Sequence, residues 1–277
     1  MFHIIKSYFK FLISSKNQHG VHSPFVFDLV TKCFYDRRNY PEYSILKEYR
    51  KSLLANHNTI EVTDFGAGSR VFKSNQRKIY AIAKNAGISP TRAELLFRIT
   101  NYFQPESVLE IGTSLGLATI ALSLGNKNAK ITTLEGCPQT LNQCQWQFQS
   151  QKSNFKSENI EFINTEFSSY LKTHHPSPIT HHLFYFDGNH SKKATLTYFE
   201  LLLPTISNNS VWIFDDIHWS KDMEEGWEMI KNHPKVTVTI DTFQWGIVFF
   251  RKEQEKEHFI INPNKNISSY IFERIRI

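Results

Sequence analysis

The chain has 277 residues, 40% of them hydrophobic and 14% aromatic, so it can bury a large core and is not an intrinsically disordered protein. No stretch approaches the ~18 to 20 uninterrupted apolar residues of a membrane-spanning helix. The net charge of +6 is compatible with a polyanionic partner. The lysines and arginines are scattered along the chain, however, which favours a solvated basic surface. The three cysteines form no CxxC pair, and we expect a reducing, cytoplasmic environment.

Residues 1–89 are predicted to form an N-terminal helical cap or extension. Within residues 1–15 the apolar positions are interrupted by Lys6 and Lys10, which predicts a basic amphipathic helix. Packing on the chain's own domain is the favoured role of this helix, and contact with a membrane surface is the alternative. Further on, helical periodicity breaks around Pro41, and residues 76–103 indicate two helices joined at "AGISP".

Residues 90–255 alternate between strand-like and helix-like patterns, which predicts parallel βαβ units. The five strands expected here are 107–111, 130–135, 160–164, 182–187 and 210–215. Two later strand patterns, 235–243 and 245–252, are too close for a crossover helix and must pair antiparallel. The predicted fold is therefore an α/β, Rossmann-like, mostly parallel seven-stranded sheet with a terminal antiparallel hairpin strand and helices on both faces. Residues 256–277 form a C-terminal extension of unknown role.

Two stretches join a strand, an acidic residue and glycines: "VTDFGAGSR" (62–70) and "VLEIGTSLG" (108–116). A nucleotide-binding turn needs glycine for close backbone approach and a following helix with free N–H groups. Only the second stretch runs into a helical pattern, "LATIALSL". Glu135 then ends the next strand, 19 residues after Gly116, where a carboxylate can accept from both ribose hydroxyls. Residues 108–135 are thus the predicted nucleotide site. "GAGS" (66–69) is expected to shape a turn, with closure over the ligand as the alternative.

The segments "VLEIGTSLGLAT", "ITTLEG", "LFYFDGNHS" and "VWIFDDIHW" together resemble the class I S-adenosylmethionine-dependent methyltransferases, in the branch similar to catechol O-methyltransferase. The resemblance covers about residues 90–252. It implies that the methionine part of the cofactor is surrounded by Glu110, Gly112, Thr113, Ser114 and Gly116. It further implies a ribose site at Glu135 and Gly136, an adenine site near Thr165 and Glu166, and a contribution from Asp187.

Three carboxylates follow two adjacent predicted strands: Asp187 after one, and Asp215 with Asp216 after the other. Carboxyl ends of parallel strands meet at the edge where ligands bind open α/β sheets, and carboxylate oxygens suit Mg²⁺. The related metal-dependent enzymes carry Asp, Asp and Asn, so Asp216 departs from their pattern. A Mg²⁺ site is one interpretation, and capping of the next helix by Asp215 and Asp216 is the other.

His190 stands three residues after Asp187, where the enzymes that the chain resembles place a lysine general base. Imidazole can accept a proton at neutral pH, so His190 and Asp187 are the predicted catalytic residues. A loop histidine bonded to neighbouring backbone is the alternative for His190. The histidines of "THHPSPITHH" (173–182) are expected to lie in an exposed loop rather than to bind a metal.

These observations predict S-adenosylmethionine-dependent O-methylation of a small-molecule acceptor, with Mg²⁺ as a further cofactor if the carboxylates bind it. A nucleic-acid methyltransferase, a non-catalytic cofactor-binding module and a nicotinamide-dependent oxidoreductase remain alternatives. The missing GxGxxG pattern weighs against the oxidoreductase. The sequence is also compatible with a homodimer.

Overall fold

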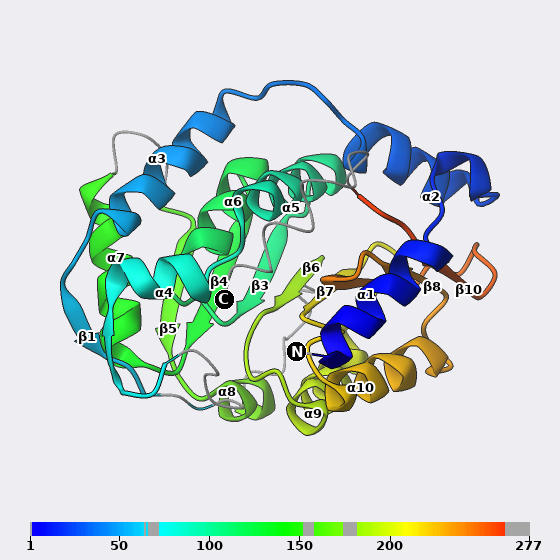
Figure 1. The fold of residues 1–277 in the computed structure, drawn as a ribbon. Coiled ribbons are helices and arrows are strands. Elements are labelled where there is room, and N and C mark those ends of the chain that lie inside the picture. The colour runs from blue at the N-terminus through cyan, green and yellow to red at the C-terminus, as the bar shows by residue number, and fades with distance from the viewer. Residues whose placement is uncertain (1, 64, 66–71, 152–157, 174–181, 264–277) are drawn as a thin grey trace.

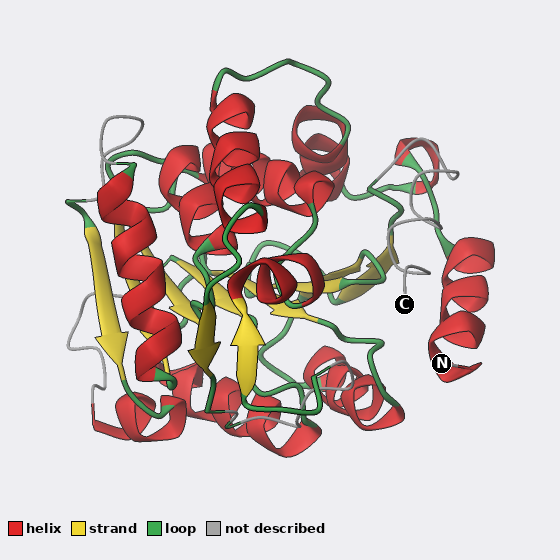
Figure 2. Cartoon of the chain, turned by 60° about the vertical axis from the view of Figure 1, so that its left-hand side comes forward, coloured by secondary structure: helices red, strands yellow, loops and turns green. Residues whose placement is uncertain are grey.

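The computed structural model describes residues 2–63, 65, 72–151, 158–173 and 182–263. In this part of the chain a mixed β-sheet lies between two layers of helices (Figure 1, Figure 2). None of the helices described is long and apolar enough to cross a membrane. The three cysteines are buried and free.

The N-terminal part begins with α1 (Phe2–Ser14), α2 (Pro24–Leu29) and α3 (Glu42–Leu54). Short helical turns lie between them at η1 (Gln18–Gly20) and η2 (Val30–Phe34). A small antiparallel hairpin follows, made of β1 (Thr59–Glu61) and β2 (Gln76–Lys78). The predicted helix pair around "AGISP" is confirmed as α4 (Ile79–Asn85) and α5 (Pro90–Phe103), the second capped by the Ser89 side chain.

The main sheet has the order β10-β8-β9-β7-β6-β3-β4-β5. Its strands are β3 (Ser107–Ile111), β4 (Lys130–Glu135), β5 (Ile160–Asn164), β6 (Leu183–Phe186), β7 (Val211–Asp215), β8 (Val238–Asp241), β9 (Trp245–Phe249) and β10 (Glu257–Ile260). Only β9 pairs antiparallel to its neighbours within this sheet. The five central parallel strands and the terminal hairpin are therefore confirmed.

Crossover helices cover both faces of the sheet: α6 (Leu117–Gly125), α7 (Pro138–Ser150), α8 (Phe167–Thr173), α9 (Lys192–Leu202), which continues into η3 (Leu203–Thr205), and α10 (Lys221–Asn232). One apolar cluster joins the sheet to helices α2 through α7, and a second joins its other face to α8, α9 and α10. Alternation along β3 explains this division, because Val108 faces the first cluster whereas Leu109 and Ile111 face the second.

Two structural features were not predicted from the sequence patterns. The segment predicted as a C-terminal extension supplies β10, which adds an eighth strand beside β8 in parallel register. The N-terminal part holds the β1–β2 hairpin as well as helices. The sequence did not predict this hairpin, because strands of three residues are too short to show an alternating hydrophobic pattern. The predicted "GAGS" turn and histidines 174, 175 and 181 lie outside the described residues.

Candidate functional site

The turn between β3 and α6 is shaped by backbone conformations that favour glycine. Gly112 has φ +103° and Gly116, which caps α6, has φ +77°, while Ser114 between them has φ +49°. A Cβ on Gly112 would collide with the backbone carbonyl of Asp187, so the end of β3 passes directly against the end of β6. The N–H groups of Gly112 and Thr113 both donate to the Leu134 carbonyl, at 3.0 and 3.1 Å, so the turn is fixed against the end of β4 as well.

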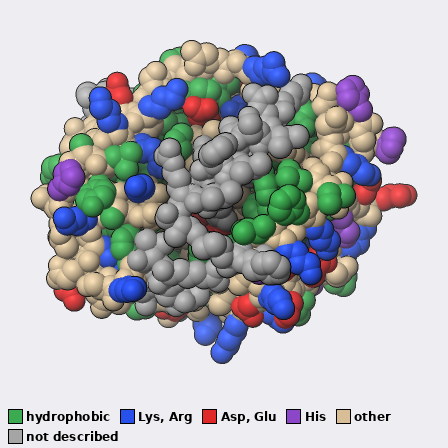
Figure 3. Space-filling model, in the orientation of Figure 1, with side chains coloured by type: hydrophobic (Ala, Val, Ile, Leu, Met, Phe, Trp, Pro, Cys, Tyr) green, Lys and Arg blue, Asp and Glu red, His purple; other side chains and the backbone are tan. Residues whose placement is uncertain are grey.

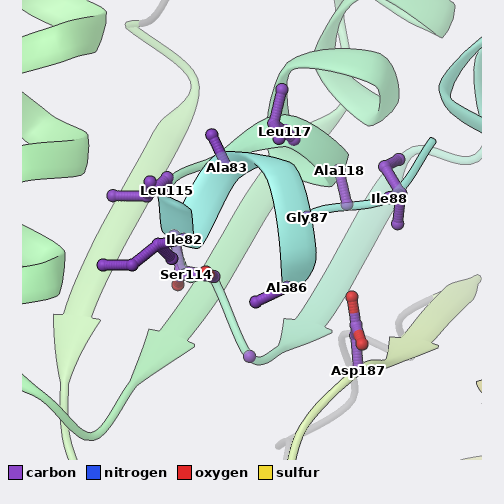
Figure 4. Close-up of a pocket in the computed structure, with 12 residues that line it drawn as sticks. Ile82, Ala83, Ala86, Gly87, Ile88, Ser114, Leu115, Leu117, Ala118 and Asp187 are labelled. Atoms are coloured by element: carbon purple, nitrogen blue, oxygen red, sulfur yellow. The ribbon is translucent and has the colours of Figure 1, made fainter. Parts of the chain in front are cut away.

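A small hollow lies over this turn (Figure 4). Gly112, Thr113, Ser114 and Asp187 line one side of it. The opposite wall comes from the end of α4 and the loop before α5, and it consists of Ile82, Ala83, Ala86, Gly87 and Ile88. The sequence motif predicted the first wall. It gave no sign of the second, because the α4 residues also follow an ordinary helical packing pattern.

Glu135 ends β4 beside the hollow and is fixed by backbone donors. Its two carboxylate oxygens accept hydrogen bonds from the N–H of Ser114 at 2.8 Å and the N–H of Cys137 at 2.9 Å. The bonds hold the carboxylate at the turn, as the spacing of the motif predicts.

Glu110 takes a different place from the one the resemblance implies. It is fully buried under the turn, where Thr119 and Thr133 donate hydrogen bonds of 2.6 and 2.5 Å to the same oxygen. Burial raises the pKa of Glu110 to about 8, although the two threonine bonds oppose the shift. Among the described residues Glu110 does not line the hollow. It therefore supports the turn from behind in a largely neutral form.

The expected adenine side is built around the end of β5. The N–H of Thr165 donates to the Glu135 carbonyl at 3.0 Å, which places Thr165 next to Glu135. Glu166 instead accepts from the backbone N–H groups of Ser168 and Ser169 at the start of α8. Burial alone would raise the pKa of Glu166, but these hydrogen bonds outweigh burial and lower it. Glu166 thus acts as a helix cap in this structure.

Phe65 lies across the same end of the sheet. Its ring rests against Gly136, since a Cβ on that glycine would meet the ring at 2.7 Å. Its backbone carbonyl accepts a hydrogen bond of 3.4 Å from the side chain of Asn189, which follows β6. Phe65 therefore bridges the ends of β4 and β6, with the glycine turn of β3 between them.

The second half of the site contains the predicted pair Asp187 and Asp215 together with a buried cation, Arg92, that the motifs did not predict. Arg92, from the first turn of α5, forms an ion pair with Asp215, and both side chains are almost fully buried. The Tyr185 hydroxyl lies 3.3 Å from Asp187 and 3.4 Å from Asp215. The Arg92 guanidinium also stands over the Trp245 ring, 5.1 Å from its centre. One cation thus faces two neighbouring carboxyl groups.

The pKa directions in this cluster follow from burial and charge. Burial and the neighbouring Asp215 carboxylate raise the pKa of Asp187 well above its usual value. Burial opposes the charged form of Arg92, but the attraction of Asp215 dominates and raises its pKa further. Arg92 therefore stays charged beside Asp215, and the raised pKa of Asp187 favours the protonated form of that carboxyl.

His190 and Asp187 come together as predicted, with 3.5 Å between Nε2 of the imidazole and Oδ1 of the carboxylate. Asp216 has φ +56°, and its N–H donates to Asp215 at 2.7 Å. Neither aspartate caps α10, because Ser220 holds that position. The second interpretation of this pair, helix capping, therefore does not describe the structure.

The donor set fits a Mg²⁺ ion poorly. Arg92 already bonds Asp215, and a divalent cation would have to displace this guanidinium or share the carboxylate with it. Within the described ranges, no group of three or more His, Cys, Asp or Glu residues could hold a metal ion.

Arg92 could have been found from one signal in the sequence. It precedes Leu95, Leu96 and Ile99 by three, four and seven residues, so it shares the apolar face of α5. A cation on a buried helix face needs a carboxylate partner. The sequence does not say which carboxylate, because Asp215 lies 123 residues away.

Comparison with known proteins places this geometry in context. Residues 109–217 match the model of a family described as a methyltransferase domain. No curated protein sequence matches the chain significantly.

Several solved structures share the fold. A methyltransferase of Podospora anserina with S-adenosylhomocysteine bound has 14% identity and a TM-score of 0.58, over 84% of this chain and 97% of that one. An O-methyltransferase of Bacillus cereus in complex with the same molecule has 15% identity and a TM-score of 0.52, over 77% and 92%. TomG of Streptomyces achromogenes, an O-methyltransferase of tomaymycin synthesis in complex with S-adenosylmethionine, has 13% identity and a TM-score of 0.53, over 77% and 91%. These similarities confirm the predicted fold.

Proposed function

We propose that this chain, which carries a methyltransferase domain on the class I methyltransferase fold, transfers the methyl group of S-adenosylmethionine to an oxygen of a small-molecule acceptor. The observation that supports this best is the position of Asp187. It lines the hollow beside the glycine turn and also contacts His190. Donor site and base are thereby joined at one sheet edge.

The residues of the turn fit the cofactor. Gly112, Thr113 and Ser114 would lie along its methionine part, Glu135 would accept from the ribose hydroxyls, and Gly136 and Thr165 would lie towards the adenine. When bound, S-adenosylmethionine supplies an activated methyl group. The apolar wall from α4 would exclude water from this end of the hollow.

His190 is assigned the role of general base. Its Nε2 faces Asp187, so Nδ1 is the nitrogen left to accept the proton of an acceptor hydroxyl. Asp187 would orient the imidazole ring. Holding the acceptor oxygen in line with the methyl group accounts for much of the remaining rate enhancement.

Arg92, rather than Mg²⁺, is assigned the role of neutralising Asp215. The guanidinium supplies a fixed positive charge beside the two carboxyl groups, and it remains protonated across the working pH range. We derive no step through a metal. Turnover measured after treatment with EDTA should therefore match turnover with added Mg²⁺. A strict Mg²⁺ requirement would contradict this assignment.

The decisive experiment is a calorimetric titration with S-adenosylhomocysteine, with NADH as the control ligand. We expect micromolar binding, about −8 kcal/mol, in the wild type and its loss in Glu135→Ala. His190→Ala should keep this binding but lower methyl transfer to a panel of phenols and alcohols by about 100-fold or more. His19→Ala, at an exposed histidine of η1, is the matched control and should change neither.

Two results would contradict the proposal. Failure of the wild type to bind S-adenosylhomocysteine would remove the methyltransferase assignment, and binding of NADH would favour an oxidoreductase. Unchanged turnover in His190→Ala with an accepted substrate would leave methyl transfer standing but exclude His190 as the base.

A further inference from the structure

Helix α1 is fixed to the rest of the molecule by its inner face. The Tyr8 and Phe11 rings pack on Phe243, with ring centres 4.8 and 5.6 Å apart. At the end of the helix, the N–H of Lys16 donates to the Ile260 carbonyl at 2.8 Å, which ties the chain to β10. The favoured role from the sequence, packing on the chain's own domain, is thus confirmed for one face of α1.

The outer face of α1 carries a second apolar row. Ile5, Phe9 and Ile13 are 45%, 61% and 86% exposed, and their spacing of four residues puts them on one side of the helix. Single exposed apolar side chains are ordinary, but a continuous row of three large ones indicates a contact surface. Figure 3 shows hydrophobic and basic side chains next to one another on the face of the molecule where α1 lies.

The lysines of α1 and of the residues just after it flank this row, and α1 itself carries no acidic side chain. Lys6 and Lys10 are exposed and follow Ile5 and Phe9 directly, and Lys16 is exposed just after the helix. Residues 1–27 contain no Asp or Glu. An apolar row flanked by lysines complements a surface whose outer layer is negatively charged and whose interior is apolar.

We propose that α1 docks this protein on the surface of an anionic lipid bilayer. The helix has 13 residues, about 20 Å, which is too short to span a core of about 30 Å, so it would lie in the plane of the interface. Because α1 is already folded against Phe243, docking requires no ordering of the chain. Phe243 follows β8 at the same sheet edge as Asp187, so docking would bring the site near the bilayer.

A second copy of the chain would cover this row less well. In a two-fold contact the same patch meets itself, so Lys6 and Lys10 of both copies would approach each other. The helix has no acidic side chain to pair with them. The anionic bilayer supplies the missing countercharge.

The test is co-sedimentation of the full-length protein with vesicles of phosphatidylcholine, either alone or with phosphatidylglycerol in equal proportion. We expect binding to the anionic vesicles that weakens with salt. The double variant Phe9→Ser and Ile13→Ser should lose at least tenfold in affinity. Lys6→Gln with Lys10→Gln should lose roughly fivefold per lysine, and only on anionic vesicles.

Matched control variants are Trp146→Ser and Met229→Ser, at side chains that are 57% and 54% exposed on α7 and α10. They should bind like the wild type, and all variants should unfold at similar temperatures. No binding by the wild type, or equal loss in the controls, would overturn the proposal. Light scattering tests whether a second copy of the chain covers the row instead. A wild-type dimer that dissociates in the Phe9→Ser and Ile13→Ser variant would assign the row to a second copy and overturn the proposal.

Discussion

The two halves of the site are held together in different ways. On the cofactor side, Glu135 is bonded to the backbone of Ser114, 21 residues away on the neighbouring strand and turn. On the acceptor side, Asp215 depends on the side chain of Arg92, 123 residues away on α5. The first half is built from backbone groups and a glycine turn, and the second from one buried cation. Substitutions should therefore affect them through different quantities, ligand affinity in one and stability in the other.

The cofactor half should respond most strongly to Gly112→Ala. The added methyl group would collide with the Asp187 carbonyl, and the residue would keep a φ of +103° that alanine disfavours. We expect affinity for S-adenosylhomocysteine to fall by at least about 100-fold, near 3 kcal/mol, measured by calorimetry. Gly226→Ala, in α10, is the control, since the nearest atom its Cβ would meet on another element is the Lys192 Cα of α9, at 3.5 Å. Equal affinity in both variants would show that the turn does not hold the ligand.

The acceptor half should respond most strongly to Arg92→Gln. Removal of one partner from a buried ion pair leaves a charge uncompensated and costs about 3 to 5 kcal/mol of unfolding free energy. Arg38→Gln is the control, because Arg38 is 70% exposed in its pair with Asp36 and its loss should change the unfolding free energy much less.

A double-mutant cycle separates this charge effect from lost packing. Combined with Asp215→Asn, Arg92→Gln should cost clearly less than the two single variants added together. Urea unfolding measures all three. Strict additivity would mean that Arg92 stabilises the protein by packing on Trp245 and not through Asp215.

The same contrast explains what the sequence could and could not predict. The spacing from Gly112 to Glu135 is local, because adjacent parallel strands bring both to one edge of the sheet. The sequence pointed to Asp187 and His190 for the same reason, because they follow β6, which is also a parallel neighbour of β3. Glu110 shares the motif but is buried against Thr119 of α6, and Arg92 has no sequence neighbour that reveals its partner. Contacts between distant elements depend on the assembled layers, which periodicity does not specify.

A second long-range cluster predicts a pH dependence of stability. Both ring nitrogens of His218 face carboxylates, Glu224 at 2.7 Å and Asp241 at 2.9 Å. Burial alone would lower the pKa of His218, but these two partners raise it to about 9. The stabilisation is therefore complete below the ordinary value near ~6.5 and is lost as the pH rises through about 9.

The size of this effect is at most about 3 kcal/mol, at about 1.36 kcal/mol for each pH unit between the two values. Unfolding free energy should decline between pH 6.5 and pH 9 in the wild type, and the decline should be weaker in His218→Gln. Parallel curves for the two proteins would show that His218 does not carry the charge.

The smallest expected effect tests whether Phe65 belongs to the cofactor half. The side chain is 55% exposed, its ring rests on Gly136, and its carbonyl accepts from Asn189, so it crosses the sheet edge above the turn. An aromatic ring at this position would cover part of a bound nucleoside, and its contact is worth about 1 kcal/mol. Phe65→Ala should therefore weaken binding of S-adenosylhomocysteine by roughly fivefold with little change in unfolding temperature. Phe27→Ala, at a 41% exposed ring on α2, should leave binding unchanged. If Phe65→Ala binds S-adenosylhomocysteine as tightly as the wild type, the Phe65 ring does not cover the ligand. Phe65 would then only connect the strand ends, through its hydrogen bond to Asn189.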